Sequence, residues 1–175
     1  MNSIRSLITA GAIALATAAP LAHAGIGDVY SATFQGITFT FTQTDTDTLT
    51  FNIAGTPAGN WAGLTYLGAF DIKADSLGLS ANSGDYGTAN GPGAIDLLSA
   101  NKQLSASGPT GSTYCAGSGL GNSFCFNLSP DLAIGPTPID LTYTIDFSKS
   151  LNIASTGPHL QICWDSFRAS KYSSL

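Results

Sequence analysis

Hydrophobic and polar residues alternate along several segments of this chain, a pattern typical of β-strands with one buried face. In Ile139–Phe147, apolar side chains occupy every second position, and Asp or Thr fills the positions between them. In Ile37–Ile53, two alternating runs flank the polar tract Gln43–Thr48. The first segment therefore predicts a half-buried strand, and the second predicts a hairpin.

The segment Leu64–Ile72 differs because both of its alternating sets of positions are largely apolar. A strand of this kind is covered on both faces, so we expect it near the centre of a sheet. Ser76–Gly93 is rich in Gly, Asn and Ser, which predicts a loop with at most one helical turn. Further strands are expected at Asp28–Phe34, Leu97–Ser105, Ser123–Leu128 and His159–Trp164. The fold class predicted is all-β, an antiparallel β-sandwich or jelly roll with about seven to nine short strands and little helix.

The N-terminal segment has the three parts of a secretory signal peptide. Arg5 precedes an apolar stretch from Leu7 to Leu21, and Ala22-His23-Ala24 supplies small residues for a cleavage site. This stretch is too short to cross a bilayer, and no later apolar run is long enough. We expect cleavage near Ala24, secretion of residues 25–175 as a single β-sandwich domain, and no stable membrane insertion of this chain.

The charge of the chain argues against nucleic acid as a partner. The sequence holds 6 Lys and Arg against 11 acidic residues, all of them Asp, for a formal net charge of -5. No run of basic residues concentrates the few cations. Binding a phosphate backbone requires such a concentration, so we expect none.

The three cysteines predict one local disulfide. Cys115 and Cys125 flank a Gly-rich connection, and an exported protein reaches a compartment in which disulfides persist. Cys163 lies on the strand face opposite Leu160, Ile162 and Trp164, and the pattern leaves open whether it is free or paired between molecules. Cys163 and His159 alone do not make a closed metal site, so no metal and no cofactor is expected.

Candidate catalytic groups are few, so we expect a protein that is not an enzyme. Ser99-Ala100-Asn101-Lys102 matches the Ser-x-x-Lys pattern of serine acyl enzymes but lacks its companion motifs. His159 has no Gly-x-Ser-x-Gly serine to serve. Asp45 and Asp47 favour a solvated turn over a calcium site. The alternative is a secreted hydrolase that uses an Asp pair or Ser99.

Threonine occupies every second position from Thr38 to Thr50, so one face of the predicted hairpin carries a row of hydroxyl groups. Thr is a preferred strand residue, and an ordinary solvent-facing surface is the simplest interpretation. The regular spacing also suits ordered water, as in ice-binding proteins, or an ordered polymer. Trp61 and Tyr86 are candidates for stacking on sugar rings, with a core position the alternative for Trp61. The candidate ligand surface is therefore made of Trp61, Tyr86, Thr38, Thr40, Thr42, Thr48 and Thr50.

Four short motifs together resemble one bacterial group. They are Asn60-Trp61, the run Gly68–Lys73, Cys115 with Phe124-Cys125-Phe126, and Gly157-Pro158-His159-Leu160. With the signal peptide, they resemble the secreted PEP-CTERM proteins. That resemblance implies an exported all-β domain at the cell surface or in the extracellular matrix, associated with exopolysaccharide or other matrix proteins. Members of the group continue into a sorting tail processed by an exosortase. The residues up to Leu175 contain no such tail, so anchoring by this route stays open.

Overall fold

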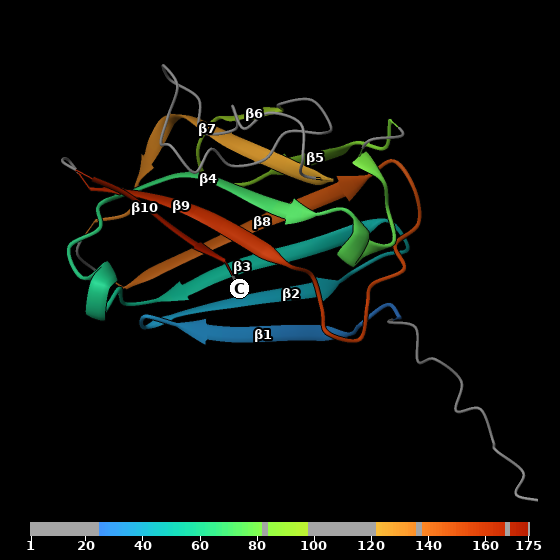
Figure 1. Ribbon diagram of the computed structural model, residues 1–175, viewed down its shortest axis with the longest axis horizontal. Coiled ribbons are helices and arrows are strands. Elements are labelled where there is room, and N and C mark those ends of the chain that lie inside the picture. The colour runs from blue at the N-terminus through green and yellow to red at the C-terminus, as the bar shows by residue number, and fades with distance from the viewer. Residues whose placement is uncertain (1–24, 82–83, 98–121, 136–137, 167–168, 175) are drawn as a thin grey trace, which may run out of the picture.

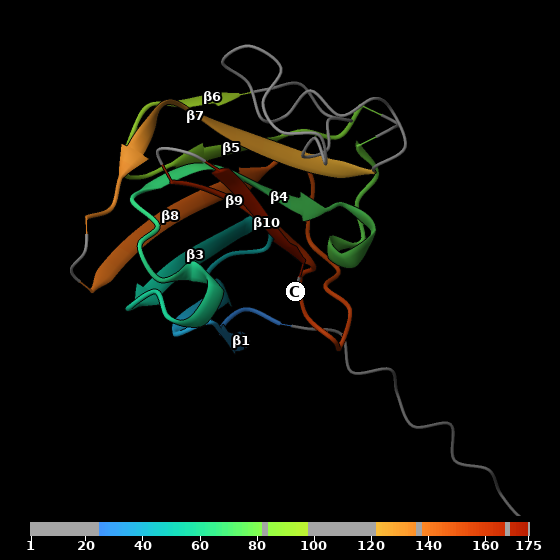
Figure 2. The same cartoon turned by 60° about the vertical axis from the view of Figure 1, so that its left-hand side comes forward.

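The computed structural model describes residues 25–81, 84–97, 122–135, 138–166 and 169–174. They form two five-stranded antiparallel sheets that pack face to face (Figures 1 and 2). The predicted all-β sandwich is therefore confirmed. Sheet A contains, in spatial order, β1 (Val29–Phe34), β2 (Ile37–Gln43), β3 (Thr48–Gly55), β8 (Ile139–Phe147) and β5 (Gly87–Asn90). Sheet B contains β10 (Ala169–Ser174), β9 (Leu160–Ser166), β4 (Tyr66–Lys73), β7 (Ser123–Ala133) and β6 (Ile95–Leu97).

Sheet A has the one-sided burial that its sequence predicts. Buried and partly exposed residues alternate throughout β2 and through β3 as far as Ala54, and the same alternation runs through most of β8. The predicted hairpin is present, with Phe41 opposite Phe51 on its inner face and Thr42 opposite Thr50 on its outer face. Residues 44–47 make the turn, so Thr44 and Thr46 do not belong to the strand rows that the sequence extended through them.

Sheet B is buried on both faces around its central strand, β4. β4 pairs with β7 on one side and β9 on the other, as expected for the segment whose two alternating sets of positions are largely apolar. Phe70 and Ile72 face the core, and Asp71 between them is also fully buried. Across the sheet, the outer-face residues Asn127 and Cys163 expose 1% and 0% of their surface. The outer face of sheet B therefore offers no accessible surface at these positions.

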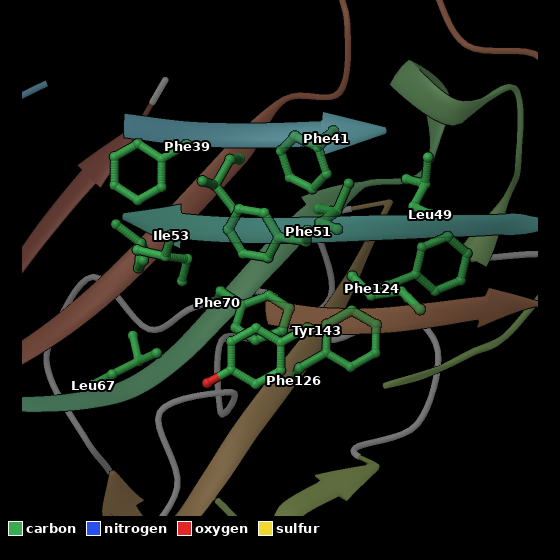
Figure 3. Packing of buried hydrophobic residues seen from close by; sticks show 14 of the residues in the cluster. Phe39, Phe41, Leu49, Phe51, Ile53, Leu67, Phe70, Phe124, Phe126 and Tyr143 are labelled. Atoms are coloured by element: carbon green, nitrogen blue, oxygen red, sulfur yellow. The ribbon is translucent and has the colours of Figure 1, made fainter. Parts of the chain in front are cut away.

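A cluster of aromatic rings joins the two sheets (Figure 3). Phe51 of β3 lies 4.4 Å from Phe41 on the neighbouring strand and 5.2 Å from Phe70 of the opposite sheet, between ring centroids. Phe70 in turn lies 5.1 Å from Tyr143 and 5.0 Å from Phe126. Each such pair adds about 0.5–1.5 kcal/mol beyond the burial of its area. This cluster therefore fixes how the sheets face each other.

Two strands were not predicted, and a third, β6, overlaps the predicted strand Leu97–Ser105 only at Leu97. β5 lies within Ser76–Gly93, which the sequence indicates as a loop, and β10 follows the last predicted strand. β5 has only four residues and pairs through its backbone with β8. Its first residue, Gly87, leaves room for the ring of Phe147, since a Cβ there would lie 3.0 Å from that ring. Such a strand has no apolar alternation to detect. The same region also contains a single 3-10 turn, Asp75–Leu77, as expected. Of the predicted strand Leu97–Ser105, residues 98–105 lie outside the described chain.

A tight turn joins β1 to β2. Gln35 and Gly36 have φ angles of 50° and 82°, the two positive values that a type I′ hairpin turn requires. A Cβ at Gly36 would also collide with the carbonyl oxygen of Thr56. Glycine is therefore needed there for both conformation and space, and it fixes the register Phe34 opposite Ile37.

The buried hydroxyl of Tyr143 provides a test of the core. Tyr143 is fully buried, and no described residue hydrogen-bonds its hydroxyl group. Burial raises the pKa of this phenol, because water no longer solvates the charged form. An unpaired buried polar group costs about 1–3 kcal/mol, so Tyr143→Phe should raise the free energy of unfolding or leave it unchanged in urea titrations. Tyr143→Ala should lower it by about 3–5 kcal/mol. A loss of stability in Tyr143→Phe would contradict this description.

Candidate functional site

The outer face of sheet A is the most regular polar surface in the described part of the chain. Its side chains come from the outward positions of β1, β2, β3 and β8, which alternate with the core residues. We call this surface the hydroxyl face. Its members are Ser31, Thr33, Thr38, Thr40, Thr42, Thr48, Thr50, Asn52, Thr142 and Thr144.

Strand register arranges the hydroxyl face in rows that cross the sheet. In one row, Thr42, Thr50 and Thr144 stand opposite one another on β2, β3 and β8. In the next, Ser31, Thr40, Asn52 and Thr142 stand opposite one another on all four strands. Neighbouring strands lie about 4.8 Å apart, and alternate residues along a strand about 6.7 Å apart. The polar groups therefore form a two-dimensional lattice.

Hydrogen bonds between neighbouring strands order this lattice. The hydroxyl oxygens of Ser31 and Thr40 lie 3.2 Å apart, and those of Thr33 and Thr38 lie 2.9 Å apart. Asn52 Nδ2 donates to Thr142 Oγ1 at 3.0 Å. Because Thr is β-branched, its χ1 is already restricted in a strand. The side chains joined in this way are thus partly ordered before any ligand arrives.

Carboxylates lie at both ends of the hydroxyl face. Asn52 Nδ2 donates to Asp140 Oδ1 at 2.8 Å at one end of β8. At the other end, the Thr48 hydroxyl lies 3.0 Å from Asp146 Oδ1 and 3.2 Å from Asp47 Oδ1. No Lys or Arg occupies an outward position of the four strands that build the face. The face is therefore neutral at its centre and negative at its ends.

Tyr86 lies at the β5 edge of sheet A and is 54% exposed. Its backbone N–H donates to Ser148 Oγ at 3.1 Å, and the Ser148 N–H donates to the Tyr86 carbonyl oxygen at 2.9 Å. The preceding residue, Asp85, is buried and accepts from Lys149 Nζ at 2.7 Å and from the Ser80 N–H at 3.0 Å. These contacts hold Tyr86 beside the hydroxyl face, where its ring is accessible.

The Asp85 contact predicts a pH-dependent stability. The hydrogen bond from Lys149, then that from the Ser80 backbone, holds the pKa of Asp85 below its usual value. A carboxylate with a lowered pKa stabilises the fold above its unfolded pKa of about 4, and that contribution is lost as the pH falls further. Asp85→Asn should therefore lower Tm at pH 7, and the difference from the parent protein should shrink below about pH 4. Thermal unfolding followed by circular dichroism measures both, with Asp75→Asn, at an exposed position, as the control. Equal differences at both pH values would contradict the assignment.

A cavity of about 210 Å³ opens beneath the inner face of β1. Tyr30 and the rings of Phe39 and Phe41 line it, and the segment Thr156–Leu160 closes one side. Gly157 packs against Tyr30, since a Cβ on this glycine would lie 2.7 Å from the ring. Partial burial, and secondarily Asp28, raises the pKa of Tyr30. No carboxylate is among the residues that line this cavity.

The predicted ligand residues divide into two groups. Thr38, Thr40, Thr42, Thr48 and Thr50 lie together on the hydroxyl face, and Tyr86 is exposed beside it. Trp61 does not join them. It is 3% exposed and packs edge-on against Phe39, with 6.1 Å between ring centroids, so its assignment to a ligand surface is corrected to a core position. Its neighbours include Phe34 and Trp164.

Sequence reasoning missed the part of the hydroxyl face that β1 and β8 supply. The alternation in Ile139–Phe147 does give Thr142 and Thr144 an outward orientation. The sequence does not show that β8 pairs with β3. Asn52 and Thr142 stand opposite each other in this pairing and are 90 positions apart in the chain. The signal for Ser31 and Thr33 was equally indirect, because Asp28–Phe34 was predicted as a strand without a partner.

Several other predicted residues fall outside the site or outside the described chain. Ser99, Lys102 and Cys115 lie in residues 98–121, so the Ser-x-x-Lys hypothesis and the Cys115–Cys125 disulfide stay predictions. Cys125 lies in β7, where it is buried. His159 precedes β9, where its backbone N–H donates to Ser76 Oγ at 3.0 Å.

The helical elements of the described ranges, Gly59–Trp61 and Asp75–Leu77, are short 3-10 helices. No helix in these ranges is long and apolar enough to span a lipid bilayer. In the same ranges, no three His, Cys or Asp side chains gather closely enough to hold a metal ion. Asp45 accepts from the Thr46 N–H at 2.6 Å, as in a polar turn.

Comparison with known proteins adds no identification. No protein-family model, curated protein or solved structure matches this chain. The resemblance to PEP-CTERM proteins accordingly stays a prediction.

Proposed function

We propose that this protein is an exported, non-catalytic binding module that holds a neutral polysaccharide of the extracellular matrix on its hydroxyl face. The observation that carries the proposal is the set of in-register rows of hydroxyl and amide groups across β1, β2, β3 and β8. The signal-peptide pattern of residues 1–24 and the resemblance to exported matrix proteins support the location.

A polysaccharide suits this surface because it also presents hydroxyl groups at regular intervals. Each direct or water-mediated hydrogen bond contributes little alone, about 0.5–1.5 kcal/mol. A regular lattice lets many of them form together along one chain. The threonine side chains pay little entropy on binding, because their rotamers are already restricted and their hydroxyls already ordered by neighbours.

The charges around the face select among polysaccharides. Asp47, Asp140 and Asp146 border it, no cation offsets them on the four strands, and the whole chain carries a formal charge of -5. An anionic polymer would meet repulsion that increases at low ionic strength. A neutral polymer avoids that cost, and Tyr86 offers an exposed ring against which a sugar can stack.

Replacing hydroxyls by methyl groups tests the proposal without changing the shape of the face. The triple variant Thr40→Val, Thr50→Val and Thr142→Val keeps β-branched side chains of nearly equal volume and removes three central hydroxyls. Retention of the protein on immobilised neutral polysaccharides should fall at least about tenfold, since a hydrogen bond is worth about 1 kcal/mol and three are removed. Thr56→Val, at an exposed position beyond β3, is the matched control and should bind as the parent does.

Two results would contradict the proposal. One is retention that the triple variant leaves unchanged, and the other is no retention of the parent protein on any neutral polysaccharide. The same samples should be assayed for released reducing ends. Turnover of the polymer, lost on substitution of an Asp pair or of Ser99, would favour the alternative of a secreted hydrolase.

A second candidate is binding of ice or ordered water through the same face. The observation that favours it is the extent of the lattice, which covers four strands and not only the hairpin that the threonine run predicts. Thermal hysteresis of the parent protein distinguishes the two. Hysteresis that the triple variant abolishes, without retention on any polysaccharide, would favour this second function.

A further inference from the structure

β1 is an edge strand without the usual protection against further pairing. It pairs with β2 on one side, and no described strand pairs with its other side (Figures 1 and 2). Natural proteins commonly protect such edges with Lys, Pro, bulges or very short strands. The sequence of β1, VYSATF, contains no charged residue and no proline. Its register with β2 is unbroken over all six residues.

The other edges of the two sheets do carry such features. β5 has four residues and lies between the Asp85–Lys149 ion pair and Gly91-Pro92. β6 has only three residues. The sequence of β10 includes Lys171. β1 is therefore the exception among the four edges.

Exposed apolar side chains gather at the same strand. Four large hydrophobic residues are exposed in the described ranges, and Ile26, Val29 and Phe34 among them lie in or next to β1, with 62%, 60% and 39% of their surface accessible. Ala32 is exposed as well. Ala32 and Phe34 lie on the inner face of sheet A, opposite Phe39 and Ile37 of β2. Sheet B therefore does not cover the inner face at β1.

The free edge has a defined hydrogen-bonding pattern. Asp28 accepts from the Gln43 N–H at 3.0 Å, so Asp28 belongs to the residues whose backbone groups point toward β2. In an antiparallel pair this orientation alternates along the strand. The backbone N–H and C=O groups of Val29, Ser31 and Thr33 consequently point away from β2, toward the open edge.

We propose that β1 pairs with β1 of a second copy of this chain, antiparallel, across a two-fold axis at Ala32. In this register Ser31 lies opposite Thr33 of the second copy, and their free backbone groups bond in both directions. Tyr30 lies opposite Phe34 of the second copy, in the non-hydrogen-bonded pairs where side chains approach most closely. Hydroxyl thus meets hydroxyl on the outer face, and ring meets ring on the inner face.

The segment VYSATF favours its own copy over an unrelated strand because this register pairs hydroxyl side chains on the outer face and aromatic rings on the inner face at the same time. No like charges meet within this register. Asp28 would face Gly36 of the second copy, and the two Asp28 residues would be eight positions apart along the paired strands. At about 3.4 Å per residue that is about 27 Å, well beyond the Debye length of about 8 Å at physiological salt.

The pairing would join two copies of sheet A with their hydroxyl faces on the same side. A polymer could then contact both copies at once, and the second contact would form at a high effective concentration. The pairing itself needs no ligand, so its test is separate from that of polysaccharide binding. A strand of six residues makes a small interface, and such interfaces are weak. Association is therefore expected between about 10 μM and 1 mM protein.

Sedimentation equilibrium of the secreted domain over this concentration range measures the association. The parent protein should change reversibly from monomer to dimer. Ser31→Pro removes the central N–H of the free edge and leaves the hydrogen bonds to β2 intact. Proline is compatible with a strand at such an edge position, where its missing N–H would not have paired within the sheet. Ser31→Pro should weaken the dimer at least tenfold, whereas Ser31→Ala, which keeps the N–H, should not. Ala32→Lys is a second disrupting variant in case proline impairs folding.

Disulfide trapping tests the register. Under mild oxidation Ala32→Cys should form a covalent dimer, because the two copies of residue 32 face each other across the axis. Ser31→Cys and Thr56→Cys should be trapped much less. A parent protein that stays monomeric up to 1 mM would overturn the proposal, and so would a ladder of higher species, which a closed two-fold contact forbids. Preferential trapping of Ser31→Cys would overturn the register.

Discussion

The contact between Phe51 of sheet A and Phe70 of sheet B is the point on which the rest of the structure depends. Phe51 packs at the same time against Phe41 and Tyr143 within its own sheet. Because side chains alternate between the faces of a strand, burying Phe51 commits Thr50 and Asn52 to the outer face. A slip of one residue in register would bury threonine hydroxyls and expose the rings, so the register is strongly specified. The regularity of the hydroxyl face is in this sense a consequence of the core.

The two sheets use their outer faces differently. On sheet B the outward residues of the central strands, such as Asp71, Ser123 and Asn127, are buried. On sheet A the corresponding residues are partly or fully exposed. An accessible surface therefore exists on only one side of the sandwich among these strands. That side is also where the side chains are short, uncharged at the centre and ordered by their neighbours.

The strands with bulky alternating residues were predictable from sequence, and the strands held by backbone pairing alone were not. β2, β3, β4 and β8 each carry a clear apolar pattern, because each contributes large side chains to the core. β5 contributes Gly87 against Phe147 and has no such pattern. For the candidate site, the threonines of the hairpin were predictable, since they follow one another in sequence. Thr142 and Ser31 joined them only through pairings between distant segments, which no local pattern encodes.

Trp61 is a residue whose location on the surface or in the core could not be decided from the sequence. Composition identifies an aromatic residue among Gly and Asn, and such a residue can either stack on a sugar or close a core. The deciding contacts are the rings of Phe34, Phe39 and Trp164, which come from three different strands. Only the assembled sandwich brings them to the short 3-10 helix Gly59–Trp61.

The inner face of β1 is only partly covered, and this follows from the same core. Sheet A reaches past the region that sheet B covers, so the rings nearest the centre are buried while Tyr30 and Phe34 at the margin remain partly accessible. Phe34 packs against Trp61 and Tyr30 against Gly157, so each of these two rings is covered over only part of its surface. β1 keeps aromatic side chains on its inner face and hydroxyl side chains on its outer face up to its free edge, the same division that β2 and β3 show. In β2 and β3 this division is explained by a neighbouring strand on each side and by the opposite sheet, which covers the inner face. β1 has the same division of side chains but a neighbouring strand on one side only. The antiparallel pairing of two β1 strands would supply the second neighbour and continue the hydroxyl lattice from one copy to the next.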